Sequence, residues 1–231
     1  MAEMSKSRGV AEPKKKTVFI VDDHPLLRKG LALLINREPD LAVCGEAEDA
    51  QTAMKAITAG KADIMIVDIS LSGPDGLDLL KNIRTVHPDL AVLILSMHDE
   101  SIYAERALRA RANGYIMKQE ATEKVLTAVR CILGGEIYLS ERMSRKLLHQ
   151  YISNSVRPAT NSELSTLSDR ELEVFRLIGE GRGTRQIADK LHISIKTVET
   201  YQAHIKNKLS LASGRELVQY AIQAKITEKT V

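Results

Sequence analysis

Short apolar segments recur along the first part of the chain, and most of them end in a polar residue. They lie at 17–22, 41–47, 63–67, 91–95 and 114–117. Runs of this length without polar alternation are typical of strands buried on both faces of a parallel sheet. Helical patterns follow these segments, at 25–35, 49–59, 77–86, 101–112 and 122–133. The alternation predicts an α/β domain with a flavodoxin-like, doubly wound, five-stranded parallel sheet in the order 2-1-3-4-5.

The pattern becomes wholly helical in the last third of the chain. Gly134 and Gly135 close the first unit, and a polar segment at 140–151 is compatible with one more helix. Residues 153–165 are rich in Ser, Asn and Thr and offer little to bury, which indicates a flexible linker. Further helices are predicted at 169–178, 184–191, 195–209 and 213–224. A short helix, a tight turn and a longer helix form the helix-turn-helix arrangement, so we expect a small all-α four-helix domain.

These patterns divide the chain into four parts. We expect a disordered leader at 1–15, a first domain at 16–136, a linker with a helix at 137–163 and the helical domain at 164–231. A chain of 231 residues is long enough for two ordinary domains. The formal charge of +3 is unevenly spread: residues 16–136 carry −4, residues 161–231 carry +2, and the rest lies in the leader and the linker. The positive balance of the second domain is a weak indication of nucleic-acid binding.

Composition argues against membrane and secreted classes. No apolar run approaches the roughly 20 residues that span a bilayer, so no membrane partner is expected. The N-terminal segment has charge but no apolar signal region. Cys44 and Cys131 have no metal-site spacing. We expect each to be a small apolar residue in a reducing compartment, and the protein to be cytoplasmic.

Polar residues stand at four of the predicted strand ends. Asp22 and Asp23 follow the first strand, Asp68 the third, Ser96 the fourth and Lys118 the fifth. In open parallel sheets, chemistry lies outside the carboxyl ends of the strands. Taken singly, each residue is better explained as a helix cap, a turn residue or a solvated charge than as part of a site. Their convergence on one crevice favours a site for phosphate and a divalent metal.

The three carboxylates predict a metal site, because like charges this close are costly unless a cation offsets them. Oxygen ligands favour a hard divalent ion, and Mg²⁺ is the expected cofactor. We expect Asp23 and Asp68 to hold the metal directly, with the backbone carbonyl of Ser70 nearby and Asp22 acting through water. Asp68 is also the expected nucleophile, which takes a phosphoryl group as an acyl phosphate.

Two further residues complete the predicted chemistry. Ser96 and Lys118 are expected to bond the phosphoryl oxygens and to stabilise the charge that builds during transfer. With these residues in place, the region resembles the receiver domain of bacterial two-component response regulators. The resemblance rests on Val21-Asp22-Asp23-His24-Pro25, the Asp68 loop, Ser96 and the Gly-Tyr-Ile-Met-Lys run that ends at Lys118.

The resemblance implies a partner and a switch. A sensor histidine kinase would donate the phosphoryl group, and Ser96 would move toward it while the Tyr115 ring turns inward. The chain departs from the family pattern at two positions. Ser72 stands where a proline is often found, and Met97 follows the switch hydroxyl where a small residue is common. We expect Met97 to slow the access of water to the phosphorylated Asp68.

The helix predicted at 195–209 carries the candidate DNA contacts. Its apolar residues Val198, Ile205 and Leu209 form one stripe, which leaves small and polar side chains on the outer face, as entry into a major groove requires. The alternative to DNA binding is that these helices form a small bundle that serves only as an interaction module. The predicted DNA-binding residues are Thr184, Arg185, Lys196, Thr197, Glu199, Thr200, Ala203, Lys206 and Lys208. The lysines and Arg185 would neutralise phosphates, and the helix N-terminus at Thr184 would add N–H donors.

This segment also resembles a known family, the LuxR-type helix-turn-helix. The resemblance rests on the run from Leu167 to Val174, on Gln186-Ile187-Ala188, on Leu191 and on the run from Ser194 to Thr200. It implies that positions 199, 200 and 203 contact bases and that the helix from Ser213 is a dimerisation surface. Glu199 either accepts from cytosine N4 or pairs with a neighbouring lysine.

Together the two resemblances imply a NarL/FixJ-type response regulator. We expect a transcription regulator controlled by phosphorylation of Asp68. In the unphosphorylated state the receiver would cover the helix at 195–209. Phosphorylation would favour an open dimer that binds paired half-sites of double-stranded DNA. One alternative is a phosphorylation-independent DNA binder with a degenerate receiver. Another is an aspartyl-nucleophile phosphatase, but Ser70 stands where such enzymes need a second acid. The arginines at 106, 109 and 111 either lie on a receiver dimerisation face or, as we favour, belong to a solvated helix face.

Overall fold

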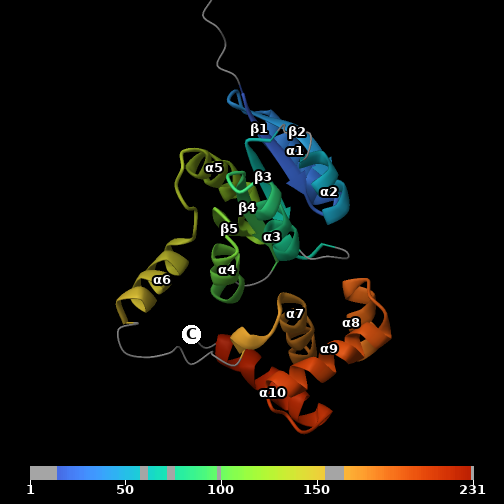
Figure 1. The fold of residues 1–231 in the computed structure, drawn as a ribbon. Coiled ribbons are helices and arrows are strands. Elements are labelled where there is room, and N and C mark those ends of the chain that lie inside the picture. Colours follow the sequence, from blue (N-terminus) through green and yellow to red (C-terminus); the bar gives the residue numbers. More distant parts are fainter. Residues whose placement is uncertain (1–14, 58–61, 72–75, 98–99, 154–163, 230–231) are drawn as a thin grey trace, which may run out of the picture.

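The N-terminal domain is a parallel sheet covered by helices on both faces. The computed structural model describes residues 15–57, 62–71, 76–97, 100–153 and 164–229 (Figure 1). The strands are β1 (Lys16–Val21), β2 (Leu41–Ala47), β3 (Ile64–Asp68), β4 (Ala91–Ser96) and β5 (Gly114–Met117). Their order is β2-β1-β3-β4-β5 and all pairs are parallel, which confirms the predicted doubly wound sheet.

Alternate strand residues pack against different helices, because successive side chains of a strand point to opposite faces. The helices of this domain are α1 (Pro25–Asn36), α2 (Ala50–Ile57), α3 (Gly76–Val86), α4 (Glu100–Arg109), the 3₁₀ turn η1 (Lys118–Glu120) and α5 (Ala121–Leu133). Ile64 and Ile66 belong to the core under α1 and α5, whereas Met65 and Val67 belong to the core under α2, α3 and α4. Both faces of β3 are therefore dry, as its unbroken apolar run predicts.

The C-terminal domain is helical. Its elements are η2 (Leu164–Thr166), α7 (Asp169–Gly179), α8 (Thr184–Leu191), α9 (Ile195–Lys208) and α10 (Gly214–Lys229). The predicted capping box at the start of α7 is present, with the Ser168 side chain accepting from the Glu171 N–H. His192 adopts a left-handed conformation (φ 53°) that ends α8, and the Ser194 side chain accepts from the Thr197 N–H to start α9. These two local features make the tight turn of the helix-turn-helix.

Most predicted elements have the expected type and nearly the expected ends. The linker helix is present as α6 (Glu141–Ser153), and it packs on α4 through the buried Met143. The last helix was predicted too short, because α10 continues to Lys229. The predicted leader, apart from Lys15, and most of the predicted flexible linker lie outside the described residues. Within the described part, no helix is long and apolar enough to cross a membrane.

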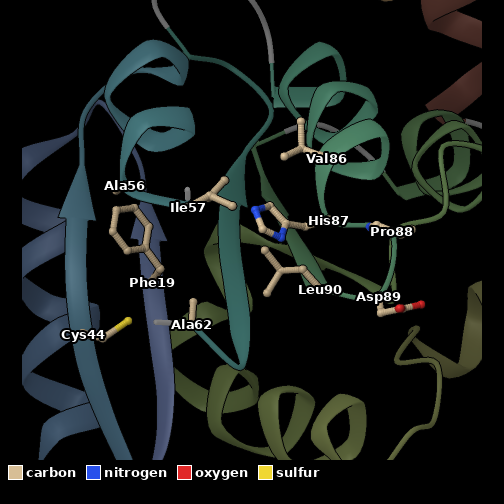
Figure 2. A pocket seen from close by; sticks show the side chains of 10 residues that line it. All are labelled: Phe19, Cys44, Ala56, Ile57, Ala62, Val86, His87, Pro88, Asp89 and Leu90. Carbon is tan, nitrogen blue, oxygen red and sulfur yellow. The ribbon is translucent and has the colours of Figure 1, made fainter. Parts of the chain in front are cut away.

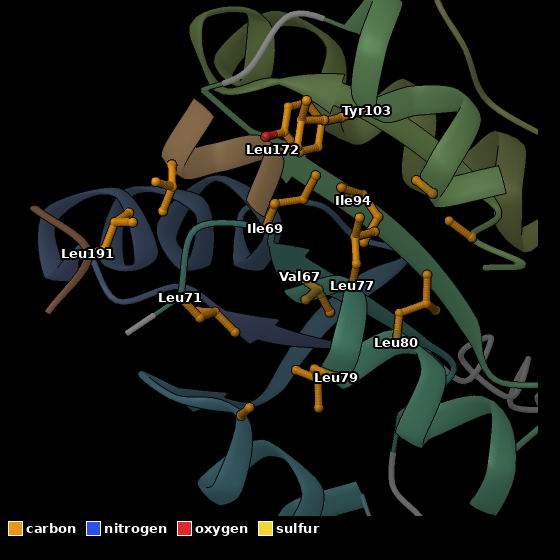
Figure 3. Close-up of a cluster of buried hydrophobic side chains, with 14 of the residues drawn as sticks. Val67, Ile69, Leu71, Leu77, Leu79, Leu80, Ile94, Tyr103, Leu172 and Leu191 are labelled. Carbon is orange, nitrogen blue, oxygen red and sulfur yellow. The ribbon is translucent and has the colours of Figure 1, made fainter. Parts of the chain in front are cut away.

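One face of α7 packs on the N-terminal domain. Figure 1 shows α7 below α3 and α4, and a single cluster of buried apolar side chains runs through both domains. Figure 3 shows Leu172 and Leu191 of the helical domain in this cluster together with Ile69, Leu71 and Tyr103. The other domain covers this face of α7, and α9 and α10 pack on its remaining faces, so the whole segment from Arg170 to Phe175 is buried.

A cavity of about 450 Å³ lies in the N-terminal domain, between α2, α3 and the sheet (Figure 2). It is lined mainly by apolar side chains, among them Phe19, Ile57 and Leu90. Ala62 and Leu90, which also line it, precede β3 and β4, whereas Asp68 and Ser96 end these strands. The cavity therefore lies at the opposite end of the sheet from the acidic residues.

Candidate functional site

Three aspartates converge at the carboxyl ends of β1 and β3. Asp68 is the last residue of β3 and is fully buried, and Asp22, which follows β1, is also buried. The side chain of Asp23 is 19% exposed and forms the open side of the cluster. Carboxylate oxygens of these residues lie within 4.8 Å of one another and of a ring nitrogen of His24. The structure thus brings together the three acids that were predicted as a metal site.

Lys118 reaches into the acidic cluster from η1. Its Nζ lies 2.7 Å from Asp68 Oδ2 and 2.8 Å from Asp22 Oδ2, and its side chain is only 4% exposed. Burial opposes the lysine charge, but the two carboxylates outweigh this effect and raise the pKa of Lys118. Burial raises the pKa of Asp68 to about 6, although Lys118 acts in the other direction. The ionised form of Asp68 is therefore unfavourable in this buried site, even with the Lys118 cation beside it.

The backbone after Asp68 is fixed by a short hydrogen bond and a close contact. The Ser70 N–H donates to Asp68 Oδ1 at 3.0 Å. The Gly76 N–H donates to the Ile69 carbonyl at 2.8 Å, and α3 begins at this glycine. A Cβ on Gly76 would lie 2.0 Å from the Asp68 carbonyl oxygen, so only glycine fits here. This glycine was not among the predicted site residues.

The turn between β1 and α1 holds Asp22 and Asp23 in place. The backbone N–H of His24 donates to Asp22 Oδ1 at 2.8 Å, and the His24 ring lies 2.7 Å from Asp23 Oδ1. Arg28 donates to the Asp22 carbonyl and pairs with Glu46 of β2. The predicted site did not include Arg28. Its signal in the sequence is a charged residue one turn after Pro25, on a helix that follows the acid pair.

Ser96 and Tyr115 occupy the neighbouring strands β4 and β5. Both side chains are buried, and the Tyr115 ring is 2% exposed. Met97, which follows Ser96, is 56% exposed. The strand ends therefore place Ser96 on the same edge of the sheet as Asp68, with the tyrosine ring already inside the domain.

The acidic cluster fits Mg²⁺ by the chemistry of its donors. Asp22, Asp23 and Asp68 offer carboxylate oxygens within reach of one another, and oxygen is the ligand that this ion prefers. The Ser70 backbone lies beside Asp68, as its hydrogen bond to that carboxylate requires. Receiver domains bind Mg²⁺ through acidic residues of this kind.

The outer face of α9 is open to solvent. Lys196, Glu199, Thr200 and Ala203 are exposed, while Val198 and Ile205 are buried against the rest of the domain. This division matches the predicted apolar stripe. We expected the N-terminal domain to cover this helix, and the structure differs. The contact between the domains involves α7, and the outer residues of α9 stay exposed.

Cations surround this face, but not all of them are equally available. Arg185 on α8 is exposed, and Lys206 and Thr184 are half-buried. The Thr184 hydroxyl accepts from the Gln202 amide at 3.4 Å. Lys208 lies 2.6 Å from Glu171 Oε2, so this predicted phosphate contact is also an ion pair within the domain. Burial opposes the charge of Glu171, but the bonds to Lys208 and Ser168 outweigh this effect and lower the pKa of the carboxyl.

The arginines of α4 do not all face solvent as predicted. Arg106 donates to the Leu164 and Leu167 carbonyls and to Asp169 Oδ1, and its side chain is only 19% exposed. Arg109 is 73% exposed and pairs with Glu105 of its own helix. The assignment was therefore wrong for Arg106, because the helical domain packs on its side of α4.

A doubly wound domain with an acid cluster and a lysine at its strand ends, followed by a helix-turn-helix, defines the class of phosphorylation-controlled DNA-binding regulators. The chain matches the family model for response regulator receiver domains over residues 18–130 and the model for bacterial regulatory proteins of the luxR family over residues 165–221. It belongs to the two-component response regulators with a LuxR-type DNA-binding domain. The resemblance inferred from the sequence is thereby confirmed.

Relatives of known function span nearly the whole chain. The oxygen regulatory protein NreC of Staphylococcus carnosus is 36% identical over 214 residues, which cover 91% of this chain and 99% of that protein. NreC of Staphylococcus aureus strain MRSA252 has the same identity and coverage.

Solved structures of response regulators are also similar. RcsB of Salmonella typhimurium has a TM-score of 0.55 and 28% identity, over 90% of this chain and 98% of that chain. A LuxR-family response regulator from Aurantimonas sp. has a TM-score of 0.56 and 31% identity, over 61% of this chain and 100% of that chain. RcsB has also been solved in complex with DNA, at a TM-score of 0.55, 28% identity, and 90% and 98% coverage.

Proposed function

We propose that this chain regulates transcription through phosphorylation of Asp68 by a sensor histidine kinase. The observation that carries the proposal is the buried Asp68 carboxylate at the end of β3, with Lys118 Nζ 2.7 Å away and two further acids beside it. A buried acid in contact with both a cation and other acids has no packing role that an apolar residue would not fill at lower cost. The arrangement is suited to receiving a phosphoryl group.

In the proposed transfer, an Asp68 carboxylate oxygen attacks the phosphorus of the kinase phosphohistidine. The new O–P bond forms as the P–N bond breaks, and its electron pair returns to the imidazole. Asp23 and Asp68 would hold Mg²⁺ directly, with the Ser70 carbonyl as a further ligand and Asp22 acting through water. When bound, the ion would offset the negative charge that accumulates during transfer.

Two residues of the strand ends would then bond the product. Lys118 moves its contact from the Asp68 carboxylate to a phosphoryl oxygen, where the ammonium charge is again compensated. Ser96 would supply a hydroxyl to another phosphoryl oxygen, and the Tyr115 ring, which is already buried, would stay in the interior. In this proposal the inward position of the Tyr115 ring leaves the hydroxyl free to approach the phosphate.

The output of the proposed switch is DNA binding by α9. Glu199, Thr200 and Ala203 would contact base edges, since they are exposed on the outer face, and Thr197 would lie beside them. Lys196, Arg185, Lys206 and Lys208 would contact phosphates, with the α8 N-terminus at Thr184. The RcsB complexes with DNA support binding to double-stranded DNA in a similar fold.

We further infer a homodimer on paired half-sites, with α10 as the contact between DNA-binding domains. The proposed boundaries are 16–136 for the receiver, 137–163 for the linker and 164–231 for the DNA-binding domain. A protein that meets both a kinase and promoter DNA would act in the cytoplasm.

Intact-protein mass after incubation with Mg²⁺ and acetyl phosphate tests the acceptor. Wild type should gain one phosphoryl group, and Asp68→Asn should gain none. Asp89→Asn is the matched control, because Asp89 is exposed in the turn between α3 and β4 and should leave the modification unchanged. An adduct on Asp68→Asn, or none on wild type, would contradict the proposal.

A further inference from the structure

The receiver and the DNA-binding domain meet through one face of α7 and the residues just before it. Asp169 at its start accepts from Arg106 at 2.9 Å and pairs with Lys81 of α3 at 3.1 Å. Two turns further on, Arg176 lies over the Tyr103 ring of α4, with 5.7 Å between its Cζ and the ring centroid. Residues spaced three or four apart share one helix face, so these contacts define a continuous contact surface on α7.

Arg170 extends this surface to residues 69–71, the segment directly after Asp68, which we call the phosphoacceptor loop. Its Nη2 donates to the Leu71 carbonyl at 3.0 Å, and its Nη1 donates to Glu173 Oε2 at 2.6 Å. Arg170 is 9% exposed and Leu71 is 1% exposed, so this contact lies in the dry part of the domain interface. A guanidinium there is tolerated because Glu173 neutralises its charge and the carbonyl accepts one of its N–H groups.

Leu71 lies three residues after Asp68. The Ser70 N–H is bonded to the Asp68 carboxylate, and the next residue offers its carbonyl to Arg170. Asp68 and Arg170 are therefore joined by two hydrogen bonds and two residues of backbone. Any rearrangement of Ser70 that carries its carbonyl toward a metal also turns the adjoining peptide and moves Leu71 relative to Arg170.

We propose that Arg170 is a positioning residue for the phosphoacceptor loop. As long as the domains are docked, Arg170 holds this segment after Asp68 in its unphosphorylated conformation. This inference rests on the proposed function. By reciprocity of coupling, a loop conformation that is stabilised by docking opposes phosphorylation, and phosphorylation weakens docking to the same degree. Control then acts through α7, since the outer face of α9 is exposed in the docked chain.

The test compares the initial rates of phosphorylation by acetyl phosphate, with Mg²⁺, of full-length wild type, Arg170→Ala and Arg170→Lys. Arg170→Ala should be phosphorylated about fivefold faster or more, the lower end of couplings between sites. Arg170→Lys should fall between the two, because lysine restores a charge but cannot bond Leu71 and Glu173 with one planar group. Arg182→Ala is the matched control, since Arg182 is an exposed arginine of the same domain that pairs with Glu180.

A merely structural role of Arg170 would lower the stability of the DNA-binding domain without changing the chemistry at Asp68. Arg106→Ala separates these cases, because it removes the contacts to Leu164, Leu167 and Asp169 from the receiver side. This variant should also accelerate phosphorylation. Unchanged or lower rates in both Arg170→Ala and Arg106→Ala would overturn the inference.

Hydrogen exchange keeps this inference distinct from the phosphorylation proposal. In the full chain without phosphodonor, Arg170→Ala should increase deuterium uptake of the backbone amides at 69–71 relative to Arg182→Ala. Equal uptake in the two variants would overturn the positioning role even if wild type is phosphorylated. Failure of wild type to accept phosphate, with increased uptake in Arg170→Ala, would overturn the proposed function alone.

Discussion

Replacing Asp68 by asparagine should stabilise the receiver domain at neutral pH. The carboxylate is fully buried, and burial raises its pKa from 3.8 to about 6. Asparagine has nearly the same shape but no charge to desolvate, and Lys118 keeps its contact with Asp22 at 2.8 Å. The substitution therefore removes an unfavourable charge without opening a cavity.

The size of the effect follows from the pKa of Asp68. A shift of about two units corresponds to about 3 kcal/mol, at 1.36 kcal/mol for each unit. The sign depends on pH. Below about pH 4 the carboxyl is protonated in both states and contributes no difference; above pH 6 it is ionised in both, and the folded state bears the full cost. Asp68→Asn should thus gain about 3 kcal/mol at pH 7.5, with the gain falling through pH 6 and vanishing near pH 4.

Urea unfolding followed by circular dichroism measures this difference, in EDTA so that no metal offsets the charge of wild type. Measurements at pH 4.5, 6 and 7.5 should show a growing stabilisation of Asp68→Asn. The exposed control Asp89→Asn should stay within about 0.5 kcal/mol of wild type at each pH. A gain that is equal at pH 4.5 and 7.5, or a loss at pH 7.5, would refute the reasoning about burial.

Three other substitutions test separate parts of the site. Gly76→Ala places a methyl group 2.0 Å from the Asp68 carbonyl oxygen. It should lower the free energy of unfolding, measured in urea, by about 1–3 kcal/mol. A variant as stable as wild type would show that the loop has room for the methyl group. Met97→Ala should shorten the lifetime of the phosphorylated protein, measured by loss of the mass adduct. Met97 is the exposed neighbour of Ser96 and is expected to shield the phosphorylated Asp68 from water. An unchanged lifetime would exclude this role. Lys196→Ala should weaken binding to all duplex sequences by a similar factor and reduce the slope of log K against log salt by about one, whereas an effect confined to one sequence would assign Lys196 to a base contact.

The receiver fold was predictable from local patterns. The apolar run before Asp68 indicated a strand buried on both faces, and β3 is buried at every position. The polar residues at the strand ends indicated the acid cluster, because parallel strands bring their carboxyl ends to one edge of the sheet. Strand register alone therefore places Asp22, Asp68 and Lys118 together.

The contacts between the domains were not predictable in this way. Arg170 and Arg106 both lie on helices where charged residues are ordinarily solvated, and nothing in the local spacing distinguishes them from Arg109. Their burial depends on which face of α7 meets α4, a property of two domains and not of either helix. The position of α9 depends on domain packing in the same way. For this reason the sequence did not reveal that the outer face of α9 is exposed and not covered by the receiver.

The most direct test of the account measures DNA binding in both phosphorylation states. Duplexes would first be selected from a randomised pool with wild-type protein in Mg²⁺ and acetyl phosphate. Fluorescence anisotropy would then give the Kd of wild type and Asp68→Asn for the selected duplex, with and without acetyl phosphate. The account predicts that acetyl phosphate tightens binding of wild type by about tenfold, within the usual range of coupling between sites, and leaves Asp68→Asn unchanged. Equal affinity of wild type in both conditions, or an equal gain in Asp68→Asn, would contradict control of DNA binding through Asp68.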